Sequence, residues 1–259
     1  MLAAMRATLL GTGTSTGVPA IGCDCRVCLS SDPRDKRLRT SCLLEWDDGT
    51  KMIIDASMDC RQQLLGVGLS RLDAVLLTHA HADHALGLDE LRMFNFLQRK
   101  AVPVYSNEET FRQVRRTFWY VFEKTQYEEG KPKLDLITVN EPFVACGKRV
   151  TPLPITHGNL DILGFRLGRF AYVTDALIVP PATRDLLRGL DVLILNALRE
   201  EPHPTHQTLA EAVEVIEDLR PERAFITHVG HWLSAADIDA KTPANVRSAH
   251  DGMSFELGD

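Results

Sequence analysis

The sequence predicts an α/β protein built from layered sheets. Short apolar runs that are typical of strands recur through both halves of the 259-residue chain. Segments with helical spacing lie between them. Several of the apolar runs end directly in a histidine or an aspartate, and strand ends are where open α/β sheets place their sites.

The strand-like runs are short and frequent, and two of them are joined by a clear turn. Asp48-Gly49 lies between two apolar runs, which is the strongest short-range signal for a hairpin. A second hairpin is expected to turn at Gly168. The expected strands are 6–10, 42–46, 51–55, 74–78 and 102–105 in the first half, and 149–155, 164–168, 170–175, 191–196 and 223–228 in the second.

Three segments have helical patterns. Residues 58–68 end at glycine, as helices commonly do. Residues 109–125 have helical spacing with aromatic side chains that we expect to pack in the core. Residues 208–221 give the clearest helix, because Thr208 and Glu211 form a capping box and Pro221 follows. The aromatic residues of the second segment are Phe111, Phe118, Trp119 and Phe122.

Composition indicates an ordinary globular protein and limits the classes of partner. Hydrophobic residues make up 44% and charged residues 25% of the chain, and the length suits one large domain or two fused half-units. The net charge of −6 argues against nucleic-acid binding by bulk electrostatic attraction. An anionic substrate would therefore need local positive charge, which bound metal ions supply.

The chain start and the cysteines favour a cytosolic protein. The apolar run at the start is too short for a leader with a cleavage site, and no run approaches the roughly 20 apolar residues of a membrane span. Six cysteines in a chain of this size do not resemble a disulfide framework. We expect Cys42, Cys60 and Cys146 to be buried free thiols.

The stretch LLTHAHADHALG, residues 76–87, carries the strongest functional signal. An apolar strand runs into His79, His81, Asp83 and His84, and a helix is expected to start directly afterwards. Four potential metal ligands within six residues are hard to explain by packing. Such a cluster suits a pair of divalent ions with a water between them.

Two ions need more ligands, and three further strand ends offer them. His157, Asp175 and His228 each follow a threonine at the end of an apolar run, as His79 does. Taken together with the first cluster, they complete a binuclear set.

With these residues the chain resembles the metallo-β-lactamase-fold hydrolases over essentially its whole length. The resemblance implies a single domain, 1–259, with an αββα four-layer sandwich of two pseudo-equivalent halves. It also implies how the residues bind two metals. One metal would take His79, His81 and His157; the other would take Asp83, His84 and His228; Asp175 would bridge them.

The N-terminal stretch GTGTSTGVPAIGCDCRVC narrows the resemblance. It is similar to the phosphoribosyl 1,2-cyclic phosphate phosphodiesterases of the C–P lyase pathway of phosphonate breakdown. In that group a three-cysteine knuckle closes on a histidine shortly after the last active-site ligand, and His231 matches it here. The resemblance implies a closed structural zinc site of Cys23, Cys25, Cys28 and His231. The alternative is three free thiols and a surface histidine.

A catalytic histidine of the same group matches His206, which precedes the capping box at Thr208. A histidine near a helix N-terminus can hold a phosphate or protonate a leaving oxygen. His203 is a rival, and Arg199 is either a phosphate contact or an ordinary exposed arginine. The chain departs from the group in the segment NALREEPHP and in the aromatic segment 109–125, which leaves the substrate open. His250 and the rim loop 11–17 are not expected to be catalytic.

The function expected from the resemblance is hydrolysis of a small cyclic phosphate ester, phosphoribosyl 1,2-cyclic phosphate or a cyclic nucleotide, by a metal-activated hydroxide. Asp83 would orient the hydroxide and His206 would protonate the leaving oxygen. The alternatives are a tRNA 3′-processing nuclease, a nonhydrolytic member like that of pyrroloquinoline-quinone biosynthesis, and a metal-binding scaffold without turnover. The active-site metals are expected to be manganese, zinc or iron. No stable nucleic-acid complex or membrane contact is expected, and a homodimer through 109–125 stays open.

Overall fold

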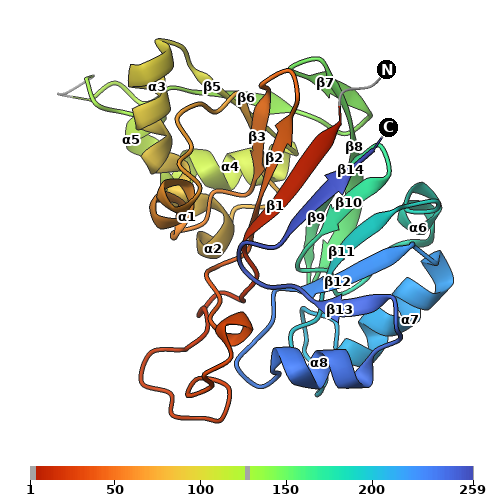
Figure 1. Ribbon diagram of the computed structural model, residues 1–259. Helices are drawn as coiled ribbons and strands as arrows, with labels where there is room; N and C mark the ends of the chain where they lie inside the picture. Colours follow the sequence, from red (N-terminus) through yellow and green to blue (C-terminus); the bar gives the residue numbers. More distant parts are fainter. Residues whose placement is uncertain (1–3, 126–128, 259) are drawn as a thin grey trace.

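The computed structural model describes residues 4–125 and 129–258, and it shows two mixed β-sheets packed face to face (Figure 1). Helices cover the outer face of each sheet, which gives four layers in the order α, β, β, α. The expected αββα sandwich is therefore confirmed.

The first sheet contains seven strands in the order β14-β1-β2-β3-β4-β5-β6. Its β14-β1-β2-β3 part is antiparallel, and β3 to β6 run parallel. The strands are β1 (Met5–Gly11), β2 (Ser41–Trp46), β3 (Lys51–Ile54), β4 (Ala74–Leu76), β5 (Val102–Ser106), β6 (Leu134–Thr138) and β14 (Ser254–Leu257).

The second sheet has the same plan, in the order β7-β8-β9-β10-β11-β12-β13. Its β7-β8-β9-β10 part is antiparallel, and β10 to β13 run parallel. The strands are β7 (Phe143–Ala145), β8 (Lys148–His157), β9 (Leu160–Leu167), β10 (Phe170–Val173), β11 (Val192–Asn196), β12 (Arg223–Thr227) and β13 (Val246–Ser248). The two halves are thus topological repeats, and β3 in one sheet corresponds to β10 in the other.

Alternation along the strands divides the apolar side chains among three cores. In β2 and β3, Leu44 and Met52 face the second sheet, whereas Leu43 and Ile53 face the helices of the first half. The helices of the second half pack over their own core on the outer face of β8 to β12. A strand buried on both faces explains why these segments are apolar throughout.

The predicted helical segments are present, with one break, and the helices Arg92–Gln98, Pro181–Leu186 and Ala235–Lys241 were not predicted. The segment 109–125 is two helices, because Phe118 leaves helical geometry, and Trp119 is 54% exposed instead of packing in the core. The capping box of Thr208 and Glu211 is present. The helices are α1 (Cys60–Gly66), α2 (Ala82–Ala85), α3 (Arg92–Gln98), α4 (Glu108–Thr117), α5 (Trp119–Phe122), α6 (Pro181–Leu186), α7 (Leu209–Leu219) and α8 (Ala235–Lys241), with 3-10 turns at Pro33–Asp35 and Leu86–Leu91.

Both expected hairpins are confirmed. Gly49 and Gly168 have positive φ angles of 83° and 58°, which glycine adopts without strain. All six cysteines are free, but Cys146 is exposed at the β7–β8 turn, so its expected burial is wrong. The backbone there has φ of 50°, and the thiol donates to the carbonyl of Asp73 at 3.6 Å instead of packing among apolar side chains.

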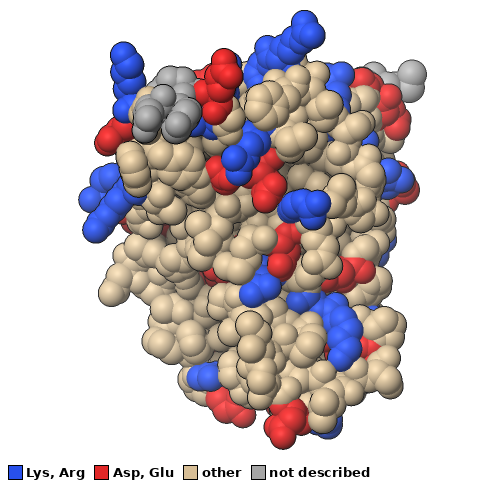
Figure 2. Space-filling view, turned by 90° about the vertical axis from the view of Figure 1, so that its left-hand side faces the viewer, with Lys and Arg blue, Asp and Glu red and all other residues tan. Residues whose placement is uncertain are grey.

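No helix among the described residues is both long and apolar enough to cross a membrane. On the face that carries the helices of the first half, basic and acidic side chains are interspersed, and no basic stripe crosses it (Figure 2). The long connection between β1 and β2 projects from one end of the sandwich, beside α8 and below the helices of the first half (Figure 1).

The backbone of Gly87 lies so close to its neighbours that a side chain would not fit there. A Cβ there would lie 2.2 Å from the Ser57 carbonyl oxygen and 2.4 Å from the Cys60 Cβ. We expect Gly87→Ala to lower the free energy of unfolding by about 1–3 kcal/mol, because the backbone must move to relieve the overlap. Gly66→Ala, at the open end of α1, is the matched control and should raise it by about 0.4–1 kcal/mol. Urea denaturation checks both, and equal effects would contradict the packing described.

Candidate active site

The predicted ligands converge where the two sheets end at the same edge. His79 follows β4, Asp83 and His84 lie on α2, and the others end or follow β8, β10 and β12. Their ligand atoms lie within 4.8 Å of one another in overlapping groups of three. The groups are His79, His81 and His157; His79, His84 and Asp175; Asp83, His84 and His228; and His157, Asp175 and His206.

Three buried residues at this edge have left-handed backbone. Asp55, Asp175 and His228 have φ angles of 62°, 59° and 53° and are at most 2% exposed. Such backbone is uncommon for residues other than glycine, and it costs free energy that the surrounding structure must supply. The sharp turn at each strand end directs these side chains to the shared edge.

Asp55, directly after β3, was missed as a site residue in the sequence. It is completely buried, and its carboxylate accepts hydrogen bonds from the Thr78 backbone N–H at 2.8 Å and the Thr78 hydroxyl at 2.9 Å. It also accepts one from the Nδ1 of His84 at 2.7 Å. Asp55 therefore fixes the positions of both the strand end and the His84 ring.

These bonds determine which ring nitrogens face the site. The Thr78 hydroxyl donates its proton to Asp55, so it accepts the Nδ1 proton of His79 at 2.9 Å. His157 donates its Nδ1 proton to the Thr205 carbonyl at 2.8 Å. The Nε2 atoms of His79, His84 and His157 are therefore the ring nitrogens that face the site and that can bind a metal.

The separations within the first group match a shared ion. The Nε2 of His79 and the Nδ1 of His81 are 3.0 Å apart, and His157 completes the group. Two nitrogens on one tetrahedral zinc ion lie about 3.3 Å apart. His81 is exposed and His79 buried, so this group opens toward solvent on one side.

In the second group, the Nε2 atoms of two histidines face two buried carboxylates. The Nε2 of His84 lies 3.3 Å from Asp83 and 3.2 Å from Asp175, yet it is buried without a hydrogen bond in the described part of the chain. The Nε2 of His228 lies 3.4 Å and 3.2 Å from the same carboxylates. Two imidazole nitrogens that face two buried carboxylates are suited to share a cation with them, so the residues fit a metal ion.

The charges of the clustered side chains shift one another's pKa values. Burial disfavours the ionised carboxylates, but His228 and His84 outweigh it and hold the pKa of Asp175 well below its usual range. The pKa of Asp83 is lowered in the same way, chiefly by His84. Burial opposes protonation of His84, but Asp175, Asp83 and Asp55 raise its pKa well above its ordinary value. The cluster thus attracts positive charge.

His206 lies beside this cluster, in the loop between β11 and α7. Its ring is 5.0 Å from that of His228, and its buried Nδ1 lies 3.8 Å from Asp175 without a hydrogen-bond partner among the described residues. Burial and His228 lower the pKa of His206 to about 3. The ring of His203 lies next to it, 5.0 Å away and tilted by 36°, whereas His250 contacts the carbonyl of Asp251 elsewhere.

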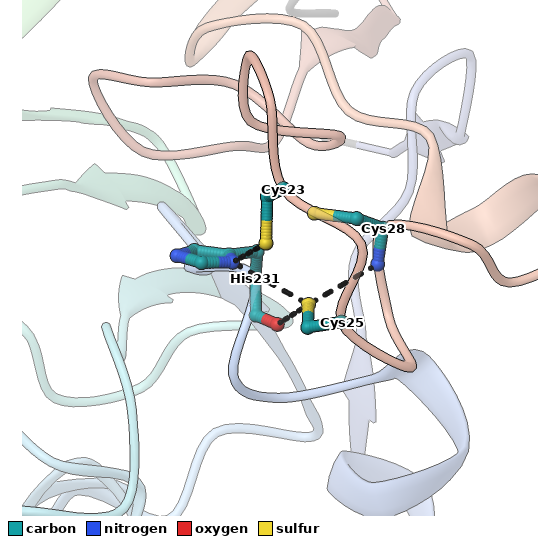
Figure 3. Close-up of side chains that lie close together, drawn as sticks. All are labelled: Cys23, Cys25, Cys28 and His231. Carbon is teal, nitrogen blue, oxygen red and sulfur yellow. Dashed lines mark hydrogen bonds between the residues drawn. The ribbon is translucent and has the colours of Figure 1, made fainter.

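The three clustered cysteines meet His231, as expected (Figure 3). The His231 Nδ1 lies 3.2 Å from the Cys23 Sγ and 3.5 Å from the Cys25 Sγ. A thiolate and an imidazole that share a zinc ion have donor atoms about 3.5 Å apart. The Cys28 backbone N–H bonds to the Cys25 thiol and lowers its pKa to about 6, which favours the thiolate. The structure brings the four residues together, and their separations fit a zinc ion.

The N-terminal loop is tied directly to the active-site edge. Val229 donates a backbone hydrogen bond to Thr12 at 3.0 Å and accepts one from Thr14 at 3.2 Å. The loop 11–17 therefore supports the segment between His228 and His231 and adds no charged side chain to the site.

The comparisons with known proteins agree with this geometry. The sequence pattern of the beta-lactamase superfamily domain matches residues 50–229. A crystal structure described as a new diphosphatase from the PhnP family is 41% identical, with a TM-score of 0.93, and the match covers 99% of this chain and 98% of that one. Zinc-bound PqqB from Methylobacterium extorquens has a TM-score of 0.80 at 20% identity, covering 97% of this chain and 100% of that one, which supports the fold alone.

A curated relative is an octanoyltransferase of Porphyromonas gingivalis, 40% identical over 253 residues. The match covers 96% of this chain but 51% of that protein, so the chain spans about half the length of this relative. The pattern match, the similar structures and the convergent histidines and aspartates lead to one conclusion: the chain belongs to the beta-lactamase superfamily and has the metallo-β-lactamase fold.

Proposed function

We propose that the protein is a phosphodiesterase that hydrolyses a small phosphate ester with the help of two divalent ions. The observation that carries the proposal is the convergence of two ligand groups around Asp175, with His206 beside them. His79, His81 and His157 would hold one ion, and Asp83, His84 and His228 the other. The Asp175 carboxylate lies 3.2 Å from His84 and His228 and 4.0 Å from His157, as a bridging ligand requires.

When bound, such a pair of ions supplies a water of lowered pKa and positive charge for the phosphate oxygens. Manganese, zinc and iron all accept this set of ligands. Asp83 stays ionised at neutral pH, so its carboxylate can accept a hydrogen bond from the attacking water and orient it.

We assign His206 to the leaving oxygen of the substrate. In the free protein its imidazole is neutral, because burial lowers its pKa to about 3. A bound phosphate would add negative charge nearby and raise that pKa, which favours proton donation in the complex. His206 would thus donate a proton or a hydrogen bond to the oxygen that departs from phosphorus.

Two substrate classes suit this arrangement. A small cyclic phosphate ester follows from the N-terminal resemblance, and the 41% identical structure is described as a diphosphatase, which favours a P–O–P linkage as a second candidate. In both, the attacked phosphorus bears two bridging oxygens and little negative charge. The net charge of −6 supports a small substrate over a nucleic acid. We do not extend octanoyl transfer to this chain, since half of that relative lies outside the match.

Phosphorus NMR of the manganese-loaded protein tests the proposal. It would be given 5-phosphoribosyl 1,2-cyclic phosphate, a 2′,3′-cyclic nucleotide and a nucleoside diphosphate sugar in parallel. Turnover of either cyclic ester supports a phosphodiesterase, whereas turnover of the nucleoside diphosphate sugar alone favours a diphosphatase. A fully metal-loaded protein that cleaves none would contradict the proposal and favour a nonhydrolytic member or a metal-binding scaffold.

We also propose that Cys23, Cys25, Cys28 and His231 bind a structural zinc ion. All four positions of a tetrahedral site would be filled by protein, so no position is open for a substrate. The zinc would fasten the N-terminal loop to the segment that follows His228.

The His206→Ala variant should lose turnover and keep its metals. We expect kcat to fall roughly 10²–10⁴-fold, the usual contribution of a general acid or base. Metal content by mass spectrometry should equal that of the wild type. His250→Ala is the control and should retain activity. A His206→Ala variant with wild-type kcat would show that the leaving oxygen needs no proton from this residue.

The Asp55→Asn variant should bind the active-site metals more weakly. An amide at this position cannot accept from the Thr78 hydroxyl and the His84 ring as the carboxylate does. Loss of such a partner typically weakens metal binding about 10–100-fold. Calorimetric titration of the apoprotein with manganese measures this, with Asp135→Asn on the exposed side of β6 as control. Unchanged affinity would contradict the orienting role of Asp55.

The Cys25→Ser variant should lose one zinc ion per chain and unfold at a lower temperature, because a structural zinc contributes folding free energy. Cys146→Ser changes an exposed thiol outside the cluster and should do neither. Zinc content and thermal unfolding provide the two readouts. Equal zinc content in both variants would contradict the structural zinc site.

A further inference from the structure

Asn196, the last residue of β11, holds the backbone next to the expected bridging ligand, although it is not itself one of the expected ligands. It is completely buried. Its Oδ1 accepts a hydrogen bond from the Ala176 backbone N–H at 2.7 Å, and its Nδ2 donates one to the Ala176 carbonyl at 3.0 Å. Ala176 directly follows Asp175. The amide of Asn196 therefore fixes the backbone on both sides of Ala176, where the chain leaves the Asp175 turn.

The turn at Asp175 needs such support for two reasons. The left-handed backbone of Asp175, with φ of 59°, is unfavourable for a residue that has a side chain. Buried backbone N–H and carbonyl groups also cost free energy if they lack partners. A side-chain amide supplies one donor and one acceptor together, and it adds no charge to a site that already holds the buried carboxylates of Asp55, Asp83 and Asp175.

The Ala176 carbonyl also connects this turn to His206. It accepts a second hydrogen bond from the Gln207 backbone N–H at 2.9 Å, and Gln207 directly follows His206. The amide of Asn196 and the Gln207 N–H thus share one acceptor. A shift of the Ala176 carbonyl would therefore move the backbone of both Asp175 and His206.

On its other side, Asn196 adjoins the strand end that carries His228. β11 lies between β10 and β12, and Asn196 pairs in register with Thr227, the residue before His228. The backbone N–H of Ala197 donates to the Thr227 carbonyl at 3.1 Å. Asn196 is therefore held on the middle strand of the three, between the turns that direct Asp175 and His228 to the site.

The first half of the fold has a comparable support in the equivalent place. β4 there corresponds to β11, and Thr78 follows β4. Thr78 bonds to Asp55, which follows β3, through its backbone N–H and its hydroxyl. In both halves a buried polar residue at the end of one strand thus fixes the left-handed turn of an aspartate on the neighbouring strand.

We propose that Asn196 is a positioning residue, which holds the Asp175 carboxylate between the two ligand groups and keeps His206 beside them. The inference rests on the proposed function, because it gives Asn196 a part in the same reaction without contact to the substrate. Loss of the amide removes the side-chain partner of the Ala176 N–H and carbonyl. We expect the Asp175 carboxylate then to move away from one of the ligand groups.

Asn95 provides a matched control in the other half of the fold. It is 7% exposed, its Oδ1 accepts from the Lys133 backbone N–H at 2.8 Å, and its Nδ2 donates to the Lys133 carbonyl at 3.0 Å. These bonds match those of Asn196, but α3, which carries Asn95, holds no residue of the ligand groups. Truncation of either side chain should therefore cost similar stability, whereas only that of Asn196 should affect the site.

The test compares Asn196→Ala with Asn95→Ala on the manganese-loaded proteins at equal metal content. Two manganese ions about 3.5–4 Å apart, as in two-metal sites, are magnetically coupled, so electron paramagnetic resonance reports on the bridging position without turnover. We expect Asn196→Ala to weaken this coupling and to lower kcat roughly 10–100-fold with little change in KM, as misplaced groups do. Asn95→Ala should keep the wild-type spectrum and kcat. Both variants should unfold at a similarly lowered temperature.

Asn196→Asp keeps the test decisive if the alanine variant does not fold. A carboxylate of the same shape accepts from the Ala176 N–H, but when ionised it cannot donate to the Ala176 carbonyl, so it should change the coupling in the same direction. Asn95→Asp is its control.

A wild-type spectrum and kcat in a folded, metal-loaded Asn196 variant would overturn the proposal. Equal changes in the Asn196 and Asn95 variants would overturn it too, and so would a metal-saturated wild type without a coupled pair. If the wild type cleaves no phosphate ester, yet only the Asn196 variants lose the coupling, the phosphodiesterase function fails and the positioning role stands.

Discussion

Two buried carboxylates, Asp83 and Asp175, face the same two imidazoles, His84 and His228, across 3.2 to 3.4 Å. The protein withdraws these charges from water, which is costly unless they are compensated. The Nδ1 atoms of His79, His84 and His157 are hydrogen-bonded to the protein, so that their Nε2 atoms point inward and can bind a metal. Cations bound between these carboxylates and imidazoles would compensate the buried negative charge. The other residues of the site hold these four side chains in position.

The repeated topology of the two sheets explains how so many charged and polar side chains are positioned at one edge. β3 and β10 occupy the same place in their two sheets, and each is followed by a buried aspartate with φ near 60°. Asp175 turns into the ligand group, whereas Asp55 turns beneath it and anchors His84 directly and His79 through Thr78. At equivalent positions, the second half of the fold thus supplies the ligand Asp175, and the first half supplies Asp55, which positions the histidine ligands. The N-terminal knuckle and the loop after β11 then bring His231 and His206 to the same edge.

Much of this could be predicted from the sequence, because strand ends with metal-binding residue types leave a local pattern. His79 to His84, His157, Asp175 and His228 were identified in this way, and the four knuckle residues through resemblance. Asp55 ends an apolar run just as Asp175 does, yet nothing local separates an aspartate that supports a ring from one that binds metal. β6, β7, β13 and β14 were also missed, because their strands are short or half exposed and depend on pairing with distant strands. The break at Phe118 and the exposure of Trp119 have the same origin, since packing and not spacing decides which aromatic side chains are buried.

Anomalous X-ray diffraction from crystals of the manganese-loaded protein, recorded at the manganese and zinc edges, tests the central claim most directly. The account predicts two manganese peaks on either side of the Asp175 carboxylate and one zinc peak among Cys23, Cys25, Cys28 and His231. Protein saturated with manganese and zinc that shows no peak between Asp175 and the histidines would contradict it, because the buried carboxylates would then be compensated by protons alone.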